Sequence, residues 1–86
     1  MTNKYNPGDW IKVGHIDAVI CKSYQDNPSR YEVVYLDNRD QAINEDVLFI
    51  NNQWNFEIQG PSGGYADKNH RLSEFVSILR KGRNPR

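Results

Sequence analysis

The sequence is poor in the features that mark secreted, disulfide-bonded or membrane-spanning proteins. It has a single cysteine, Cys21, which excludes a disulfide within the chain and fits a reducing compartment. The longest apolar runs, such as Val47–Ile50, are far too short to span a bilayer. The opening residues, MTNKYNPGDW, lack the apolar segment of a signal peptide. We therefore expect a cytoplasmic protein with no membrane partner.

The chain also lacks net charge, because 11 Lys and Arg residues balance 11 Asp and Glu residues. Composition thus gives no general electrostatic reason to expect binding to nucleic acid or to a membrane surface. The charges are unevenly placed, however. Residues 1–59 carry five basic and nine acidic side chains, and residues 60–86 carry six and two. We interpret the basic part as lying on the acidic body, or on a second copy of the chain, rather than as a site for an anionic partner.

Spacings typical of metal and catalytic sites are missing. His15, Cys21 and His70 contain no close pair such as C-x₂-C, which structural zinc sites normally need. Cys21 sits in an apolar run, and we interpret it as a buried, inert thiol. The carboxylates fall in predicted turns, and we interpret them as solvated surface: Asp37, Asp40, Glu45, Asp46 and Glu57. We predict a protein that is not an enzyme and uses no metal or cofactor.

Five short segments have the composition and alternation of β-strands. They are rich in β-branched and aromatic residues and are separated by turn signals every eight to twelve residues, which is typical of a small barrel or sandwich. The run Ala18–Cys21 is apolar throughout, so we expect both of its faces to be covered. Asn44–Asp46 interrupts the fourth segment and suggests a bend or a 3₁₀ turn. Asn51–Asn52 predicts a turn. The strands are expected near residues 10–13, 15–24, 31–37, 42–51 and 53–58.

The last part of the chain has the period of an amphipathic helix. Its apolar stripe recurs at i, i+3, i+4 and i+7. Asp67 or Asn69 can cap the start of this helix, and Gly82 suits its end. Ile78 falls beside the stripe and widens it, which suggests contact with a second element or a second subunit. The stripe consists of Leu72, Phe75, Val76 and Leu79.

These patterns predict one mainly β domain over residues 1–86. It comprises a five-stranded antiparallel barrel over 8–58, a Gly-rich connector over 59–69, one C-terminal amphipathic α-helix over 70–82 and a tail over 83–86. The stretches PGDWIKV and EVVYLDNRDQAINEDVL, within residues 8–58, resemble the SH3-like small barrels, and the Tudor group in particular.

The Tudor resemblance implies a possible ligand site, because members of that group hold methylated Arg or Lys in an aromatic cage. In the matched register Tyr35 takes the place of one cage ring. The other cage positions fall at Asp37–Asn38, near Ile16 and near Gly14–His15, where this sequence has no comparable ring. We therefore interpret the hairpin over 31–50 as the frame of a barrel, and Tyr35 as a half-buried strand residue.

The aromatic content points to an interaction surface, because a chain of 86 residues cannot hide ten aromatic rings in its core. Trp54 lies among Asn and Gln residues and is expected to be partly exposed. We predict a non-enzymatic protein-interaction module whose partner is another protein or a second copy of itself, as in a homodimer. The candidate binding residues are Trp54, Tyr35, Trp10, Tyr65 and Ile78.

Nucleic-acid binding is the alternative function. Small barrels bind single strands by stacking bases on aromatic rings within a basic groove. The neutral net charge and the acidic barrel count against this alternative. The residues that would form such a surface are Tyr24, Tyr31, Lys22 and Arg30.

Overall fold

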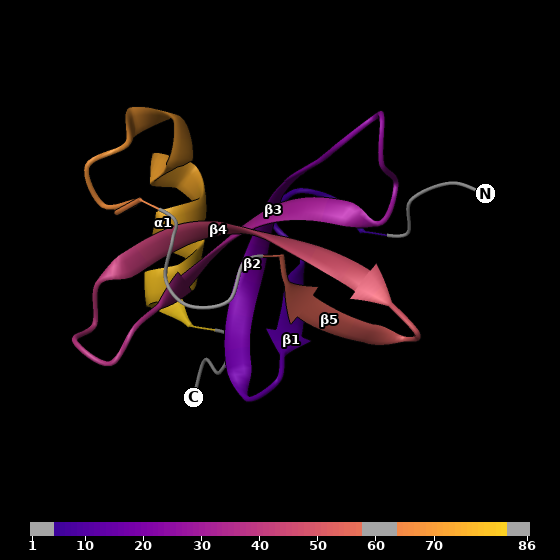
Figure 1. Ribbon diagram of the computed structural model, residues 1–86. Helices are drawn as coiled ribbons and strands as arrows, with labels where there is room; N and C mark the ends of the chain where they lie inside the picture. Colours follow the sequence, from indigo (N-terminus) through magenta and orange to yellow (C-terminus); the bar gives the residue numbers. More distant parts are fainter. Residues whose placement is uncertain (1–4, 58–63, 83–86) are drawn as a thin grey trace.

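The computed structural model describes residues 5–57 and 64–82 and shows a curled antiparallel sheet with one helix against it (Figure 1). The predicted mainly β fold with five strands and a C-terminal helix is confirmed, with the sheet forming a half-barrel. The predicted connector over 59–69 falls partly, and the tail over 83–86 wholly, outside the described residues. The elements are β1 (Trp10–Val13), β2 (Ile16–Ser23), β3 (Arg30–Leu36), β4 (Ala42–Ile50), β5 (Gln53–Phe56), the 3₁₀ helix η1 (His70–Leu72) and α1 (Ser73–Lys81).

The strand order in the sheet follows the sequence, so each strand pairs with the next through a hairpin. Two of these hairpins have two-residue loops, which favour residues that tolerate positive φ. Gly14 has φ of 66° in the loop between β1 and β2. Asn51 and Asn52 have φ of 55° and 63° between β4 and β5, so the turn predicted there is confirmed.

Alternation along the strands divides the apolar side chains between two faces of the sheet. In β3, Tyr31, Val33 and Tyr35 belong to one cluster, while Val34 belongs to the other. We call the first cluster the inner face, because the curled sheet encloses it. It consists of Ile11, Val13, Ala18, Ile20, Tyr31, Val33, Tyr35, Ile43 and Val47.

The opposite side of the sheet, here called the outer face, is covered by η1 and α1 (Figure 1). The predicted stripe is confirmed, since all four of its residues pack in this cluster, and Ile78 packs beside them. Burying one leucine stabilises a fold by roughly 1.5–3 kcal/mol, so packing of the stripe, more than intrinsic propensity, holds so short a helix. The buried members are Val19, Cys21, Val34, Ala42, Ala66, Leu72, Val76 and Leu79.

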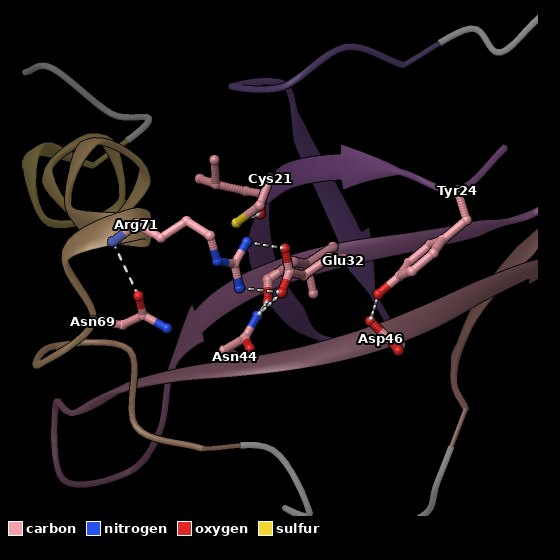
Figure 2. Close-up of polar contacts among 9 residues, drawn as sticks. Cys21, Tyr24, Glu32, Asn44, Asp46, Asn69 and Arg71 are labelled. Carbon is pink, nitrogen blue, oxygen red and sulfur yellow. Dashed lines mark hydrogen bonds and ion pairs between the residues drawn. The ribbon is translucent and has the colours of Figure 1, made fainter.

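The start of the helical segment is fixed by polar contacts (Figure 2). The side chain of Asn69 accepts a hydrogen bond from the backbone N–H of Arg71, which confirms Asn69 as a cap. The Arg71 guanidinium donates two hydrogen bonds of 3.0 Å to the Glu32 carboxylate on β3. Asn44 of β4 donates a third hydrogen bond to Glu32, at 3.0 Å. The helical segment is thereby tied to the middle of the sheet.

A second set of contacts ties the same segment to the start of β4. Asp67 accepts a hydrogen bond from the backbone N–H of Ala42 at 3.0 Å and one from the Arg80 guanidinium at 2.9 Å. Arg80 also lies 3.6 Å from the carboxylate of Asp40. Together with the bonds between Arg71 and Glu32, these contacts show basic residues of the C-terminal part meeting acidic residues within one chain.

Burial and hydrogen bonding shift the pKa of the Glu32 carboxyl in opposite directions. Desolvation alone would raise the pKa of its carboxyl, but the hydrogen bonds from Arg71 and Asn44 and the positive charges of Arg71 and Lys22 together hold the pKa below its ordinary value. Next to this pair, burial raises the pKa of the Cys21 thiol to about 12, with a smaller contribution from the charge of Glu32. Cys21 is thus buried, as the sequence predicts, and its raised pKa keeps the thiol protonated at neutral pH.

The bend or 3₁₀ turn predicted in the fourth strand is absent from the structure. Asn44–Asp46 form no bend, because β4 runs unbroken from Ala42 to Ile50. The two carboxylates in the middle of β4 both accept hydrogen bonds from tyrosine hydroxyls: Glu45 from Tyr35 at 3.0 Å, and Asp46 from Tyr24 at 2.7 Å. The expectation that Ala18–Cys21 is covered on both faces is confirmed, since each of these side chains is 5 % exposed or less.

Within residues 5–57 and 64–82, no helix is long and apolar enough to cross a membrane.

Candidate functional site

A pocket of about 340 Å³ opens at the end of the half-barrel where β2 starts and β3 ends. We call it the barrel-mouth pocket. Four strands and one turn contribute to it, so it depends on the curl of the whole sheet. Its lining residues are Ile16 of β2, Tyr35 and Leu36 of β3, Asp37 and Asn38 of the following turn, Glu45 of β4 and Phe56 of β5.

Two aromatic rings form one wall of the barrel-mouth pocket. The ring centroids of Tyr35 and Phe56 lie 5.2 Å apart, with an angle of 48° between the ring planes. Phe56 is half-buried and packs against the inner face. The faces of such rings attract cations through the ring quadrupole, with an energy that rises as water is excluded.

Two carboxylates lie beside these rings. Glu45 is 6 % exposed and accepts the hydrogen bond from the Tyr35 hydroxyl. Burial, together with this bond to Glu45, raises the pKa of Tyr35 to about 12, so the phenol stays protonated at neutral pH. Asp37 accepts hydrogen bonds of 2.9 Å from the backbone N–H groups of Arg39 and Gln41, which fix the turn. Among the described residues that line this pocket there is no Lys or Arg.

A second pocket, of about 440 Å³, lies between the start of the sheet and the end of α1. We call it the helix-side pocket. It shares Ile16 and Leu36 with the barrel-mouth pocket, so the two pockets are neighbours. It is lined by Trp10, His15, Ile16, Asp17, Leu36, Leu79 and Gly82.

The five candidate binding residues do not gather in one place. Tyr35 lines the barrel-mouth pocket and Trp10 the helix-side pocket. Ile78 is half-buried against the outer face. Tyr65 is 63 % exposed, and its backbone forms an isolated antiparallel β-bridge with Ile43 of β4.

The fifth candidate, Trp54, is half-buried in an aromatic cluster on the inner face. Its ring centroid lies 4.7 Å from that of Phe49, 5.1 Å from that of Tyr5 and 5.2 Å from that of Tyr31. Trp54 lines neither of the two pockets. These ring contacts give its side chain a packing role.

The residues named for nucleic-acid binding come together only in part. Lys22 Nζ lies 4.9 Å, and the Arg30 guanidinium carbon 5.2 Å, from the centroid of the Tyr24 ring. Carboxylates already engage two of these three groups, since Arg30 pairs with Glu57 through two hydrogen bonds and the Tyr24 hydroxyl donates to Asp46 (Figure 2). Tyr31 is 3 % exposed and belongs to the inner face.

Neither Glu45 nor Phe56 was predicted to line a pocket, but both line the barrel-mouth pocket. The interpretation of Glu45 as solvated surface in a turn is wrong, because this residue lies within β4 and is buried. The alternation Ile43, Glu45, Val47 was the available signal, because it places Glu45 on the same face as two core residues. Phe56 was recognised as a strand residue, but nothing in the sequence brought it next to Tyr35.

Metal binding has no structural support in the part of the chain that is described. There, no three His, Cys, Asp or Glu side chains come together as a group that could hold a metal ion.

No protein-family model, no curated protein and no solved structure matches this chain. The resemblance to Tudor domains therefore stays a prediction. The structure itself shows the coarser feature, a five-stranded antiparallel half-barrel with a C-terminal helix.

Proposed function

We propose that this protein is a small, non-enzymatic protein-interaction module that holds a cationic side chain of its partner in the barrel-mouth pocket. The observation that carries the proposal is the wall formed by Tyr35 and Phe56 beside the carboxylates of Glu45 and Asp37. Aromatic faces and carboxylates both favour a positive charge, and neither favours an anion.

The charged groups at the pocket also favour the binding of a cation. A carboxylate held away from water attracts an opposite charge more strongly than an exposed one does, because the surrounding medium screens less. Glu45 is buried in this way, and Asp37 is half-buried at the rim. Within residues 5–57 and 64–82, no Lys or Arg that would repel a cation lines the pocket.

The size of the pocket fits a single side chain. A volume of about 340 Å³ lies at the lower end of the range for small-ligand sites. Phe56 also supplies a second ring that the Tudor register did not offer. The pocket therefore suits an arginine or lysine side chain of a partner protein better than a larger cofactor.

The test is a titration of the labelled protein with N-acetyl-arginine methylamide, followed by amide NMR. The matched control ligand is the citrulline analogue, which has nearly the same shape but no charge. We expect the amide peaks of Asp37, Asn38 and Phe56 to shift with the arginine compound, with a Kd on the order of 1 mM, and to stay in place with citrulline. Equal shifts with both compounds, or none with either, would reject the proposal.

Two matched variants test whether the arginine compound binds at the barrel-mouth pocket. Asp37→Asn removes one charge from the rim and keeps a side-chain oxygen that can accept the two turn hydrogen bonds. Asp26→Asn makes the same change in net charge on an exposed loop that lines neither pocket. We expect the first variant to weaken arginine binding and the second to leave it unchanged.

Nucleic-acid binding is the second candidate, and the position of Lys22 and Arg30 around Tyr24 favours it. The measurement is fluorescence anisotropy of a labelled ten-nucleotide single strand at two salt concentrations. Binding that weakens steeply with salt and is lost in Lys22→Gln would support this function. Absence of binding at low salt would exclude it.

A further inference from the structure

Tyr65 is the most exposed large apolar side chain in the described part of the chain, at 63 %. Its backbone pairs with that of Ile43, the second residue of β4. Residues that lie directly opposite one another in an antiparallel pair point to the same face, and Ile43 belongs to the inner face. The Tyr65 side chain therefore lies on the inner-face side. Ala66 agrees with this assignment, because it is buried in the outer-face cluster and neighbours along an extended segment point to opposite faces.

Hydrogen bonds on either side of Tyr65 fix its backbone against β4. The N–H of Asn44 donates to the carbonyl oxygen of Gly64 at 2.9 Å. The N–H of Ala66 donates to the carbonyl oxygen of Ala42 at 2.8 Å. Because the backbone is held in this way, a ligand that meets the ring has only the side-chain torsions of the tyrosine to order, which keeps the entropic cost of binding small.

The strand register places this ring beside the barrel-mouth pocket. Tyr35 of β3 pairs with Ile43 on its other side, so Tyr35, Ile43 and Tyr65 form one row across the inner-face side of the sheet. Phe56 pairs with Val47, on the same edge of β4 as Tyr65 and on the same face. The rings of Tyr35, Phe56 and Tyr65 thus border one part of the inner face.

A ring at this position is within reach of a cation in the pocket. Two strand spacings put the backbones of Tyr35 and Tyr65 about 10 Å apart, and a cation is attracted to an aromatic face within about 6 Å of the ring centroid. Tyr35 and Phe56 line the pocket, whereas Tyr65 is not among the described residues that line it. Its ring is therefore available to cover a ligand that the two lining rings contact from the other side.

We propose that Tyr65 is a further binding residue of this site, and that its ring packs on the cationic side chain held in the barrel-mouth pocket. The inference rests on the proposed function of that pocket. The phenol ring covers the outward side of the bound side chain, opposite the wall made by Tyr35 and Phe56. Binding removes water from an apolar ring that folding leaves exposed, and this burial adds to the affinity.

The experiment repeats the titration with N-acetyl-arginine methylamide, followed by amide NMR, in the unmodified protein and in three variants. Tyr65→Leu removes the ring and keeps a large apolar side chain, whereas Tyr65→Phe keeps the ring. The control is Ile50→Ala, which removes exposed apolar surface at the other end of β4. The amide peaks of Ala66 and Leu72 report whether the segment that carries Tyr65 stays in place in each variant.

We expect the amide peaks of Tyr65 and Asp37 to shift together when the unmodified protein is titrated. Tyr65→Leu should weaken binding of the arginine compound by about two- to fivefold, which is the contribution of one solvent-exposed contact between a cation and a ring. Tyr65→Phe and Ile50→Ala should bind as tightly as the unmodified protein. Nuclear Overhauser contacts between the ligand and the Tyr65 ring should appear in the unmodified protein, and this measurement does not depend on any variant.

Other results overturn the inference and separate it from the proposed function. If Tyr65→Leu binds as tightly as the unmodified protein while Asp37→Asn weakens binding, the role of Tyr65 is rejected and the cation site stands. Equal weakening in Tyr65→Leu and Tyr65→Phe, or absence of the Overhauser contacts with ligand bound, likewise rejects the role of the ring. If the arginine compound does not bind the unmodified protein at all, both proposals fall.

Discussion

Glu32 and Glu45 make an instructive comparison, because the same sheet buries one on each face. They are 5 % and 6 % exposed, but their partners differ. Glu32 on the outer face is bound by the Arg71 guanidinium and the Asn44 amide, and this pairing holds the helical segment in place. Glu45 on the inner face accepts a hydrogen bond from the phenol hydroxyl of Tyr35, and it borders the barrel-mouth pocket. Glu32 thus holds elements of the fold together, whereas Glu45 borders the pocket that we propose binds a cation.

The largest expected effect comes from breaking the outer-face pair. Arg71→Met leaves the Glu32 carboxylate buried without its guanidinium. Removing one partner of a buried ion pair typically costs ~3–5 kcal/mol, but the Arg71 side chain is 55 % exposed, so we expect a loss of about 2 kcal/mol in the free energy of unfolding. Urea unfolding followed by circular dichroism measures it.

Two controls sharpen this prediction. The double variant Glu32→Leu with Arg71→Met removes both charges, and its stability should return to within about 1 kcal/mol of the unmodified protein. Arg80→Met breaks an ion pair whose carboxylate, Asp67, is far more exposed than Glu32, so it should have a much smaller effect than Arg71→Met. A double variant as unstable as Arg71→Met alone would contradict the assignment of the cost to the unpaired carboxylate.

On the inner face, removing the hydroxyl group of Tyr35 should lower the free energy of unfolding by a smaller amount. Tyr35→Phe keeps the ring that packs against Phe56 but deletes the hydroxyl that donates to Glu45. The loss of one such hydrogen bond should lower the free energy of unfolding by about 1 kcal/mol. The same urea experiment measures it, with Tyr65→Phe as the control at an exposed position. An equal loss in both variants would argue against a structural role for the bond between Tyr35 and Glu45.

The smallest expected effect is a change in how stability depends on pH. The pKa of Glu32 is lower in the folded protein than its ordinary value of 4.5, so the folded state favours the charged form. This contribution is fully present above the ordinary value and is lost as the pH falls through the lowered value. Urea unfolding at a series of pH values below 5 should show a shallower acid loss in Glu32→Gln than in the unmodified protein. Identical slopes would mean that other carboxylates, such as Glu57 and Asp67, account for the acid sensitivity.

Local patterns were enough to predict most of the fold, because its signals are short-range. Alternation marked the strands, Asn51–Asn52 supplied residues that tolerate positive φ, and Asn69 capped the helical segment. The bend predicted at Asn44–Asp46 was wrong for a long-range reason. Those polar residues are satisfied by partners on other elements, including Tyr24 and Tyr35, which propensity along β4 does not reveal.

The candidate site was predictable only in part, for a related reason. Tyr35 could be named from its strand, and its register with Ile43 places Glu45 nearby on the same face. The contact with Phe56 depends on something else. β3 and β5 are separated by β4 in the sheet, so these two rings meet only because the sheet curls. Curvature arises from twist and packing of the whole sheet, and no single residue encodes it.

The most direct test of the account is to compare cation binding by Glu45→Gln and Glu32→Gln. The two variants make the same chemical change on opposite faces of one sheet and alter the net charge equally. NMR titration with N-acetyl-arginine methylamide should show about tenfold weaker binding in Glu45→Gln, because a contact with a charged carboxylate is lost, and a Kd within about twofold of the unmodified protein in Glu32→Gln. Equal weakening in both variants, or none in Glu45→Gln, would contradict the claim that the inner-face carboxylate serves binding.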